Sequence, residues 1–211
     1  TWAIDRIKES AAASKRCFIA ETMGRRCGYL TLMSALSSGA EYMYINEESP
    51  SLEQIAADAD RMVASFKSGR RLFLTLVNES ASQYYDREFL ADVFNAESEG
   101  IYDVRHMALG HMQQGGSPSP YDRLLATRLV ARAFEQLVDQ FERGDRGAYY
   151  IGQVGNAVEA RPVKNMFDDL DIENRRPFVQ WWRDLLPVQR IVSLQNPGIE
   201  ATPIPIDDPI A

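Results

Sequence analysis

Three loops of this sequence carry residue types that suit a phosphorylated sugar. Arg25 and Arg26 follow a short apolar run, and Asn78-Glu79 and His111 follow two others. Arginine presents planar donor forks to phosphate oxygens and histidine also suits phosphate, whereas a glutamate carboxylate accepts from sugar hydroxyls. The combination predicts a sugar-phosphate site in which local cationic groups hold the ligand.

Each of these residues also has an ordinary structural explanation. Arg25 and Arg26 could be solvated loop charges, and Glu79 could cap the helix that follows it. His111 could be a loop histidine with satisfied hydrogen bonds. The residues taken singly leave these alternatives open, and the prediction depends on their occurring together.

Several other chemistries lack support in the sequence. His106 and His111 have no cysteine at ligand spacing, so we expect no metal site. No glycine-rich stretch ends in Gly-Lys-Ser or Gly-Lys-Thr as a P-loop does, and the formal net charge of -7 argues against general nucleic-acid binding. Cys17 and Cys27 are the two cysteines, which favours a reducing, cytoplasmic compartment. No apolar run approaches the roughly 20 residues that span a bilayer.

The elements that must position these loops alternate between strand and helix patterns. This alternation predicts an α/β fold with a mainly parallel sheet and helices on its faces. In such folds ligands bind beyond the carboxyl ends of the strands, where the three loops would lie. The predicted strands are 17–21, 42–45, 72–77 and 105–109, with weaker candidates at 148–151 and 157–163. The predicted helices are 2–10, 30–36, 55–66, 87–95, 121–141 and 181–194, the last interrupted near Pro187. Helix 121–141 carries Leu124, Leu125, Leu129, Phe134, Leu137 and Val138 on the side expected to be buried.

Two of the loops resemble segments of the phosphofructokinase family. Met23-Gly24-Arg25-Arg26-Cys27-Gly28-Tyr29-Leu30 is similar to the family segment Met-Gly-Arg-x-Cys-Gly-Tyr-Leu. The stretch from Leu109 to Arg123 is similar to Leu-Gly-His-x-Gln-x-Gly-Gly-x-Pro-x-x-x-Asp-Arg. Shorter matches extend the resemblance to about Val192. The resemblance implies part of a three-layer, parallel-sheet sandwich over 1–195. The prolines that follow Asn196 predict a loose C-terminal tail at 196–211.

The resemblance also implies roles for individual residues. It gives Arg16 and Arg105 as phosphate ligands reaching across a subunit interface, Met23, Gly24 and Arg25 as a sugar-holding loop, Glu79 as a hydroxyl acceptor and His111 as a phosphate contact. The family's ATP loop and catalytic aspartate motif belong to sequence upstream of Thr1. We therefore expect no catalytic residue, no cofactor and no phosphoryl transfer in these 211 residues alone. Mg and ATP are expected for the complete enzyme.

The family's eukaryotic subunits combine a catalytic half with a regulatory half, and two segments here resemble the regulatory one. Gln114 stands where catalytic halves carry arginine, and Arg175 would bind the second phosphate of fructose 2,6-bisphosphate, an allosteric activator. Arg25, in contrast, restores the catalytic-type Met-Gly-Arg. The alternatives are the fructose 6-phosphate-binding portion of a catalytic half and a non-binding assembly module. Expected partners are the remainder of the subunit and further subunits in a homo- or hetero-oligomer, with no nucleic acid and no membrane.

Overall fold

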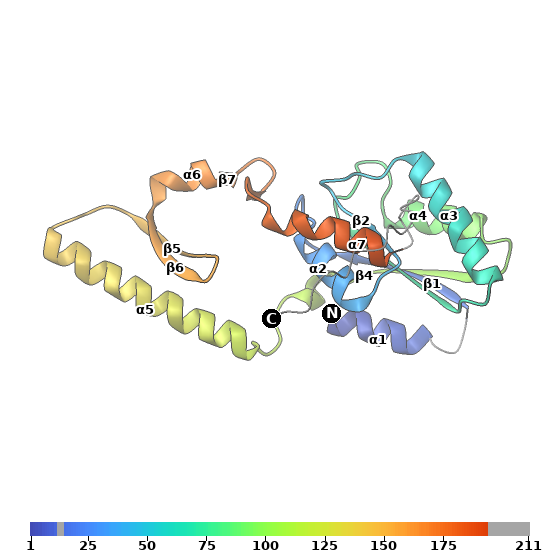
Figure 1. Cartoon of the computed structure of the whole chain (residues 1–211), viewed down its shortest axis with the longest axis horizontal. Coiled ribbons are helices and arrows are strands. Elements are labelled where there is room, and N and C mark those ends of the chain that lie inside the picture. Colours follow the sequence, from blue (N-terminus) through green and yellow to red (C-terminus); the bar gives the residue numbers. More distant parts are fainter. Residues whose placement is uncertain (12–14, 194–211) are drawn as a thin grey trace, which may run out of the picture. The chain divides into compact units, whose positions relative to one another are not determined.

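The computed structural model describes residues 1–11 and 15–193, so the predicted tail at 196–211 lies outside the described residues (Figure 1). The chain divides into two compact units. We call Thr1–Gly110, together with the residues from Trp181 on, the sheet unit, and His111–Gln180 the hairpin unit.

The sheet unit is built on four parallel strands in the order β2-β3-β1-β4. They are β1 (Arg16–Thr22), β2 (Tyr42–Tyr44), β3 (Leu72–Asn78) and β4 (Asp103–Ala108). The central strands are apolar on both faces, because a parallel sheet is covered by helices on each side. This confirms the predicted parallel α/β fold, and each strand begins and ends within two residues of its predicted bounds.

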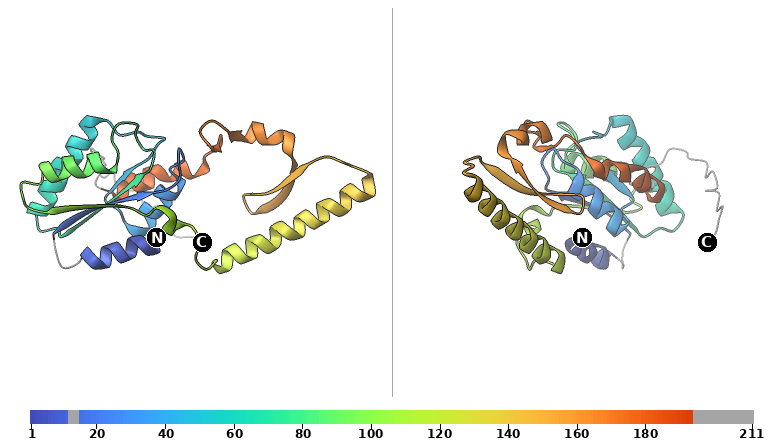
Figure 2. Two further views of the ribbon diagram at one scale, coloured as in Figure 1. Left: turned by 180° about the vertical axis from the view of Figure 1, so that it is seen from behind. Right: turned by 60° about the vertical axis from the view of Figure 1, so that its left-hand side comes forward.

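Helices cover both faces of this sheet, as the views in Figure 2 show. They are α1 (Trp2–Ala11), α2 (Tyr29–Ser38), α3 (Leu52–Lys67), α4 (Arg87–Ala96) and α7 (Leu186–Val192). One core cluster joins the sheet to α3 and α4, and includes Cys17, Ile19 and Phe73. A second cluster joins the opposite face to α1, α2 and α7, and includes Ala20 and Leu74. Alternate residues of β1 and β3 thus enter different cores, which makes the sheet the middle of three layers.

Local signals explain where several helices begin and end. The Ser51 hydroxyl accepts from the backbone N–H of Gln54 at 3.1 Å and so caps α3. Gly39 ends α2 in the left-handed conformation. The helix predicted at 181–194 with an interruption near Pro187 consists of two pieces: Trp181–Leu185 forms a 3-10 helix, and α7 begins at Leu186 and ends at Val192. Residue 194 lies outside the described residues. Pro187 stands in the first turn of α7, where its missing N–H costs nothing.

The hairpin unit consists of one long helix, an antiparallel hairpin and short pieces. Its elements are α5 (Pro120–Arg143), β5 (Tyr149–Val154), β6 (Ala157–Pro162), α6 (Met166–Asp169), β7 (Leu170–Asp171) and β8 (Arg176–Pro177). Two 3-10 turns complete it, Val163–Asn165 within the unit and Gly110–Gln113 at its start. A capping box between Ser119 and Asp122 begins α5, and Gly144 ends it in the left-handed conformation.

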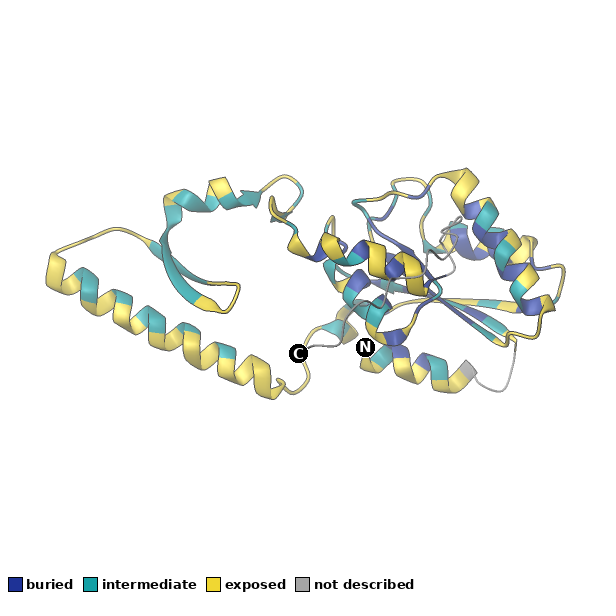
Figure 3. Ribbon diagram, in the orientation of Figure 1, coloured by how far each residue is buried: buried dark blue, intermediate teal, exposed yellow. Residues whose placement is uncertain are grey.

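The expectation that α5 buries its apolar side was wrong. Leu124, Phe134, Leu137 and Val138 are all exposed, and Figure 3 shows α5 without any buried position. The helical period shows which side chains share a face but not what covers that face. One helix and one hairpin do not enclose a core.

Candidate functional site

The loop that follows β1 is fixed to the end of β3 by a single carboxylate. The strands are neighbours and parallel, so both end at the same edge of the sheet. The backbone N–H groups of Gly24 and Arg25 both donate to Glu79 Oε1, at 3.0 and 2.5 Å. The N–H of Glu79 in turn donates to the Thr22 carbonyl at 3.0 Å. The structure therefore brings three of the predicted site residues together, Gly24, Arg25 and Glu79, with Met23 in the same loop.

The conformation of this loop requires glycine at position 24. Gly24 has a φ of +153°, and a Cβ there would lie 2.6 Å from the Cys27 carbonyl oxygen and 3.1 Å from Asn78 Nδ2. The turn is closed by the Cys27 N–H, which donates to the Gly24 carbonyl at 2.9 Å. Arg25 follows with a φ of 50°, which is uncommon for a residue other than glycine. Such backbone conformations concentrate at functional sites.

A second carboxylate fixes the other end of the loop. Both oxygens of Glu47 accept from the N–H of Gly28, at 3.1 and 3.0 Å. A Cβ on Gly28 would lie 2.6 Å from Ile45 Cβ, so glycine is required by this close approach as well. The loop is held at both ends, while the side chains of Arg25 and Arg26 between them are exposed.

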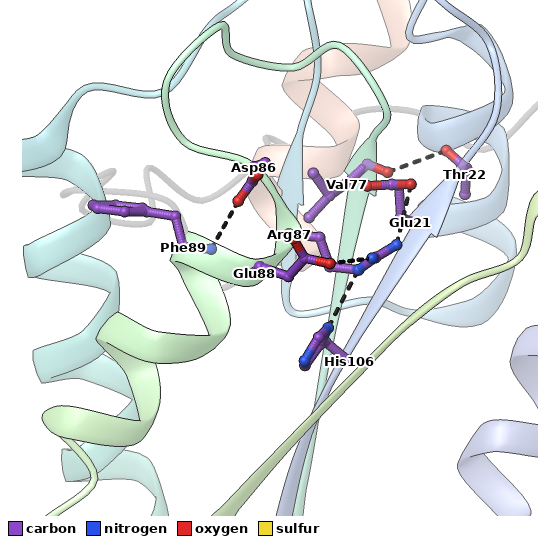
Figure 4. A network of polar contacts seen from close by, with 8 residues as sticks. All are labelled: Glu21, Thr22, Val77, Asp86, Arg87, Glu88, Phe89 and His106. Carbon is purple, nitrogen blue, oxygen red and sulfur yellow. Dashed lines mark hydrogen bonds and ion pairs between the residues drawn. The ribbon is translucent and has the colours of Figure 1, made fainter.

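A polar network lies beside this loop, centred on a residue that the sequence did not single out (Figure 4). Arg87, in the first turn of α4, donates to Glu21 Oε1 at 3.3 Å, to Glu88 Oε1 at 2.6 Å and to His106 Nδ1 at 3.2 Å. Burial raises the pKa of Glu21, Arg87 opposes that shift, and nearby carboxylates including Glu79 add to it. Glu21 lies two residues before the loop motif that begins at Met23, and this position was the signal in the sequence that could have identified the network.

Arg16 and Arg105 are not brought to the loop. Arg16 begins β1, whereas the loop follows the other end of that strand, roughly 20 Å away at about 3.3 Å per residue. Its Nε is buried and has no hydrogen-bond partner among the described residues. Arg105 pairs with Phe18 in the register of β4, on the same face as Arg16, and lies 3.6 Å from Asp103 Oδ2. Their positions near the amino end of β1 keep them apart from Arg25.

The other predicted site residues belong to the hairpin unit. The N–H of Gln114 donates to the carbonyl of His111 at 3.0 Å, which closes the turn after β4. Arg175 is exposed in the turn between β7 and β8 and has a φ of 55°. That turn is built by Asn174, whose backbone and side-chain N–H groups donate to Asp171 at 3.0 and 2.7 Å. These bonds lower the pKa of Asp171.

Two further features bear on what the molecule can bind. In residues 1–11 and 15–193, no group of three or more His, Cys, Asp or Glu side chains is placed to hold a metal ion. No helix in the same ranges is both long enough and apolar enough to cross a bilayer. A cavity of about 480 Å³ lies between α3 and α7, and its walls include Arg61 and Gln189 rather than any predicted site residue.

A parallel three-layer sandwich with an arginine-bearing loop at the carboxyl edge of its sheet places the chain in the α/β class, in which ligands bind at that edge. The family model "Phosphofructokinase" matches residues 1–137, which is more than half of the chain. The chain belongs to the phosphofructokinase family.

The chain is similar to a part of several longer enzymes. It is 37% identical to the ATP-dependent 6-phosphofructokinase of Dictyostelium discoideum, with 98% of this chain and 24% of that one covered. It is 38% identical to the human muscle-type enzyme, with coverages of 90% and 26%. A solved structure of phosphofructokinase from Saccharomyces cerevisiae superposes with a TM-score of 0.82 at 29% identity, covering 90% of this chain and 26% of that one. The chain spans about a quarter of the length of these relatives.

Proposed function

We propose that the chain forms the sugar-phosphate-binding part of the regulatory half of a 6-phosphofructokinase subunit, with fructose 2,6-bisphosphate as its ligand and allosteric activator. The observation that carries this proposal is the loop at Gly24 and Arg25, which Glu79 holds at the edge of the sheet. Both amides bind Oε1, so Oε2 can accept from a sugar hydroxyl. The exposed guanidinium of Arg25 supplies donors for a phosphate.

The regulatory assignment is supported by the predicted ligands of the hairpin unit. Gln114 offers an uncharged amide where the catalytic halves of the family carry arginine. Arg175 is exposed on a turn fixed by Asp171, and adds the cation that a second phosphate requires. His111 would contact a phosphate, and Arg16 and Arg105 would serve a site shared with a neighbouring subunit.

In this proposal the ligand acts through the assembled enzyme. Binding stabilises the active arrangement of the subunits and raises the affinity for fructose 6-phosphate at a distant catalytic site, with a typical coupling of about 1–3 kcal/mol. The complete cytoplasmic enzyme would use Mg and ATP to convert fructose 6-phosphate to fructose 1,6-bisphosphate in glycolysis. Its partners would be subunits of the same family in a homo- or hetero-oligomer.

Arg25 favours a second candidate function. The Met-Gly-Arg sequence at 23–25 is of the catalytic type, and the guanidinium is exposed for a substrate phosphate. In this alternative the chain supplies the fructose 6-phosphate pocket of an active site, and another part of the enzyme supplies ATP and the catalytic aspartate.

Calorimetry on a subunit that contains these residues separates the two functions. Replacing Arg175 by alanine should weaken fructose 2,6-bisphosphate binding by about tenfold to a hundredfold, as expected for one charged phosphate contact. Arg143→Ala, which removes an exposed arginine at the end of α5, is the matched control and should change nothing. Loss of turnover in His111→Ala with unchanged binding of the bisphosphate would favour the active-site alternative. If neither fructose 2,6-bisphosphate nor fructose 6-phosphate gives heat on binding, both the regulatory and the active-site function are rejected.

A further inference from the structure

A cavity in the sheet unit lies apart from the loop at Gly24 and Arg25. It has a volume of about 480 Å³ and lies between α3 and α7. These helices pack on opposite faces of the sheet, and β2 is an edge strand of that sheet. Cavities of about 300–1,000 Å³ are typical of small-molecule sites. The apolar part of the cavity wall consists of Met43, Ile45, Ala57 and Leu186.

A buried glutamine on this wall has an unused acceptor. Gln189 is 2% exposed, and its Nε2 donates to the carbonyl of Ala40 at 3.2 Å, which sets the orientation of the amide. Its Oε1 is buried and has no hydrogen-bond partner among the described residues. A buried polar atom without a partner is unfavourable, so a donor supplied by a bound molecule would stabilise this arrangement.

An arginine on the same cavity has an unused donor. Arg61 forms an ion pair with the buried Asp58 through Nη2. Its Nε is buried and has no hydrogen-bond partner in residues 1–11 and 15–193. A carboxylate is the side-chain acceptor that binds a guanidinium N–H most strongly. The cavity therefore has one buried atom that needs a donor and another that needs an acceptor.

The charged groups on the cavity walls balance one another. They are two carboxylates and two guanidinium groups, those of Glu48, Glu53, Arg61 and Arg190. Arg190 donates to both oxygens of Glu48, at 2.7 and 2.8 Å, and Arg61 is paired with Asp58. A phosphorylated ligand would meet no surplus of cations here. The balance favours a molecule whose own charges sum to zero.

We propose that this cavity binds an α-amino acid with an apolar side chain. Such a molecule is a zwitterion without net charge. Its ammonium group is the donor that Gln189 Oε1 lacks, and its carboxylate is the acceptor that Arg61 Nε lacks. Its side chain packs on the apolar wall, where the thioether of Met43 suits an aromatic ring. The proposal does not depend on sugar-phosphate binding, so either can fail without the other.

Calorimetry with L-phenylalanine, on a subunit that contains these residues, tests the proposal. L-Phenylalanine should bind with a Kd of about 1 mM or tighter. Two analogues each lack one charged group: phenethylamine has no carboxylate, and hydrocinnamate has no ammonium. Each analogue should bind at least about tenfold more weakly, because it cannot form one of the two charge-assisted hydrogen bonds.

Two substitutions test whether the amino acid binds in this cavity. Gln189→Met removes Oε1, and Arg61→Lys removes Nε but keeps a positive charge beside Asp58. Each should weaken L-phenylalanine binding at least about tenfold. Gln54→Met is the matched control, because it makes the first change at an exposed glutamine on the same cavity. It should alter the affinity by less than about threefold.

Three results would overturn the proposal. They are no binding of L-phenylalanine, binding of either analogue as tight as that of L-phenylalanine, and unchanged affinity in Gln189→Met and Arg61→Lys. The first would indicate that water completes the two missing hydrogen bonds, and the last would place the amino acid elsewhere. If Gln189→Met does not fold, Arg61→Lys and the two analogues still decide the outcome.

Discussion

Replacing Gly24 by alanine tests the loop geometry most directly. The new Cβ would lie 2.6 Å from the Cys27 carbonyl oxygen, whereas a close carbon–oxygen contact is about 3.3 Å or more. The two atoms must therefore separate by roughly 0.7 Å. Because the Gly24 N–H also donates to Glu79 Oε1 at 3.0 Å, that movement acts on the hydrogen bond that holds the loop.

The chain contains a matched control at Gly69. Its φ of +106° is also unfavourable for alanine, but a Cβ there would meet nothing within 4 Å. Both substitutions carry backbone strain of about 1–3 kcal/mol. Gly24→Ala alone loses a hydrogen bond to a charged group, and for the exposed Glu79 the lower end of the usual range applies, about 1.5 kcal/mol.

Urea unfolding of the two variants gives the first measurement. Gly24→Ala should lower the free energy of unfolding by about 1.5 kcal/mol more than Gly69→Ala does. In a subunit that contains the chain, Gly24→Ala should also weaken fructose 2,6-bisphosphate binding by at least about tenfold, and Gly69→Ala should not. Equal losses of stability would show that the loop absorbs the clash. Equal affinities of the two variants for fructose 2,6-bisphosphate would show that the loop is not part of the proposed site.

Three further predictions concern buried or partly buried groups. The buried Tyr44 hydroxyl donates to the buried Asp58 carboxylate at 2.6 Å. Tyr44→Phe should therefore lower the free energy of unfolding in urea by about 1.5–3 kcal/mol. A decrease below about 0.5 kcal/mol would contradict this contact. Burial raises the pKa of Cys17 to about 12, so a thiol reagent should label Cys27 in the folded chain and should label Cys17 only after unfolding. Equal labelling rates for the two cysteines in the folded chain would be inconsistent with the burial of Cys17. Burial also raises the pKa of Glu21, so its contribution to stability is present below the unfolded pKa and is lost as the pH rises through the folded one. Glu21→Gln should therefore gain stability relative to the unaltered chain as the pH rises above the unfolded pKa of glutamate, about 4.3, and a difference independent of pH would refute the shift.

The sheet could be predicted from the sequence because its strands are buried on both faces. Leu72–Asn78 is apolar except for Thr75 and Asn78, and six of its seven residues are buried. The predicted order of strands and helices then places the ends of β1 and β3 at one edge. This is why Arg25 and Glu79 could be predicted to lie close together from pattern alone.

The means by which the loop is held could not be predicted in the same way. Glu79 accepts from the backbone N–H groups of Gly24 and Arg25. Every residue other than proline has such a group, so a pattern of side chains does not show which of them Glu79 will bind. Arg87 meets Glu21 across 66 positions of sequence, so their contact depends on the assembled sheet. The apolar side chains of α5 gave a false expectation for a related reason, since periodicity does not identify the surface that covers a helix.

The Glu79 contact has a consequence for how the loop can recognise an anion. Free backbone N–H groups at the carboxyl edge of a parallel sheet commonly bind phosphate, but those of Gly24 and Arg25 are directed at a carboxylate. With Glu21 and Glu88 near the same edge, the backbone offers little attraction to a phosphate. In the proposed function, recognition of a phosphate at this loop would then come from guanidinium side chains. Arginine is suited to that role because its charge is permanent and its donors can bind two phosphate oxygens together.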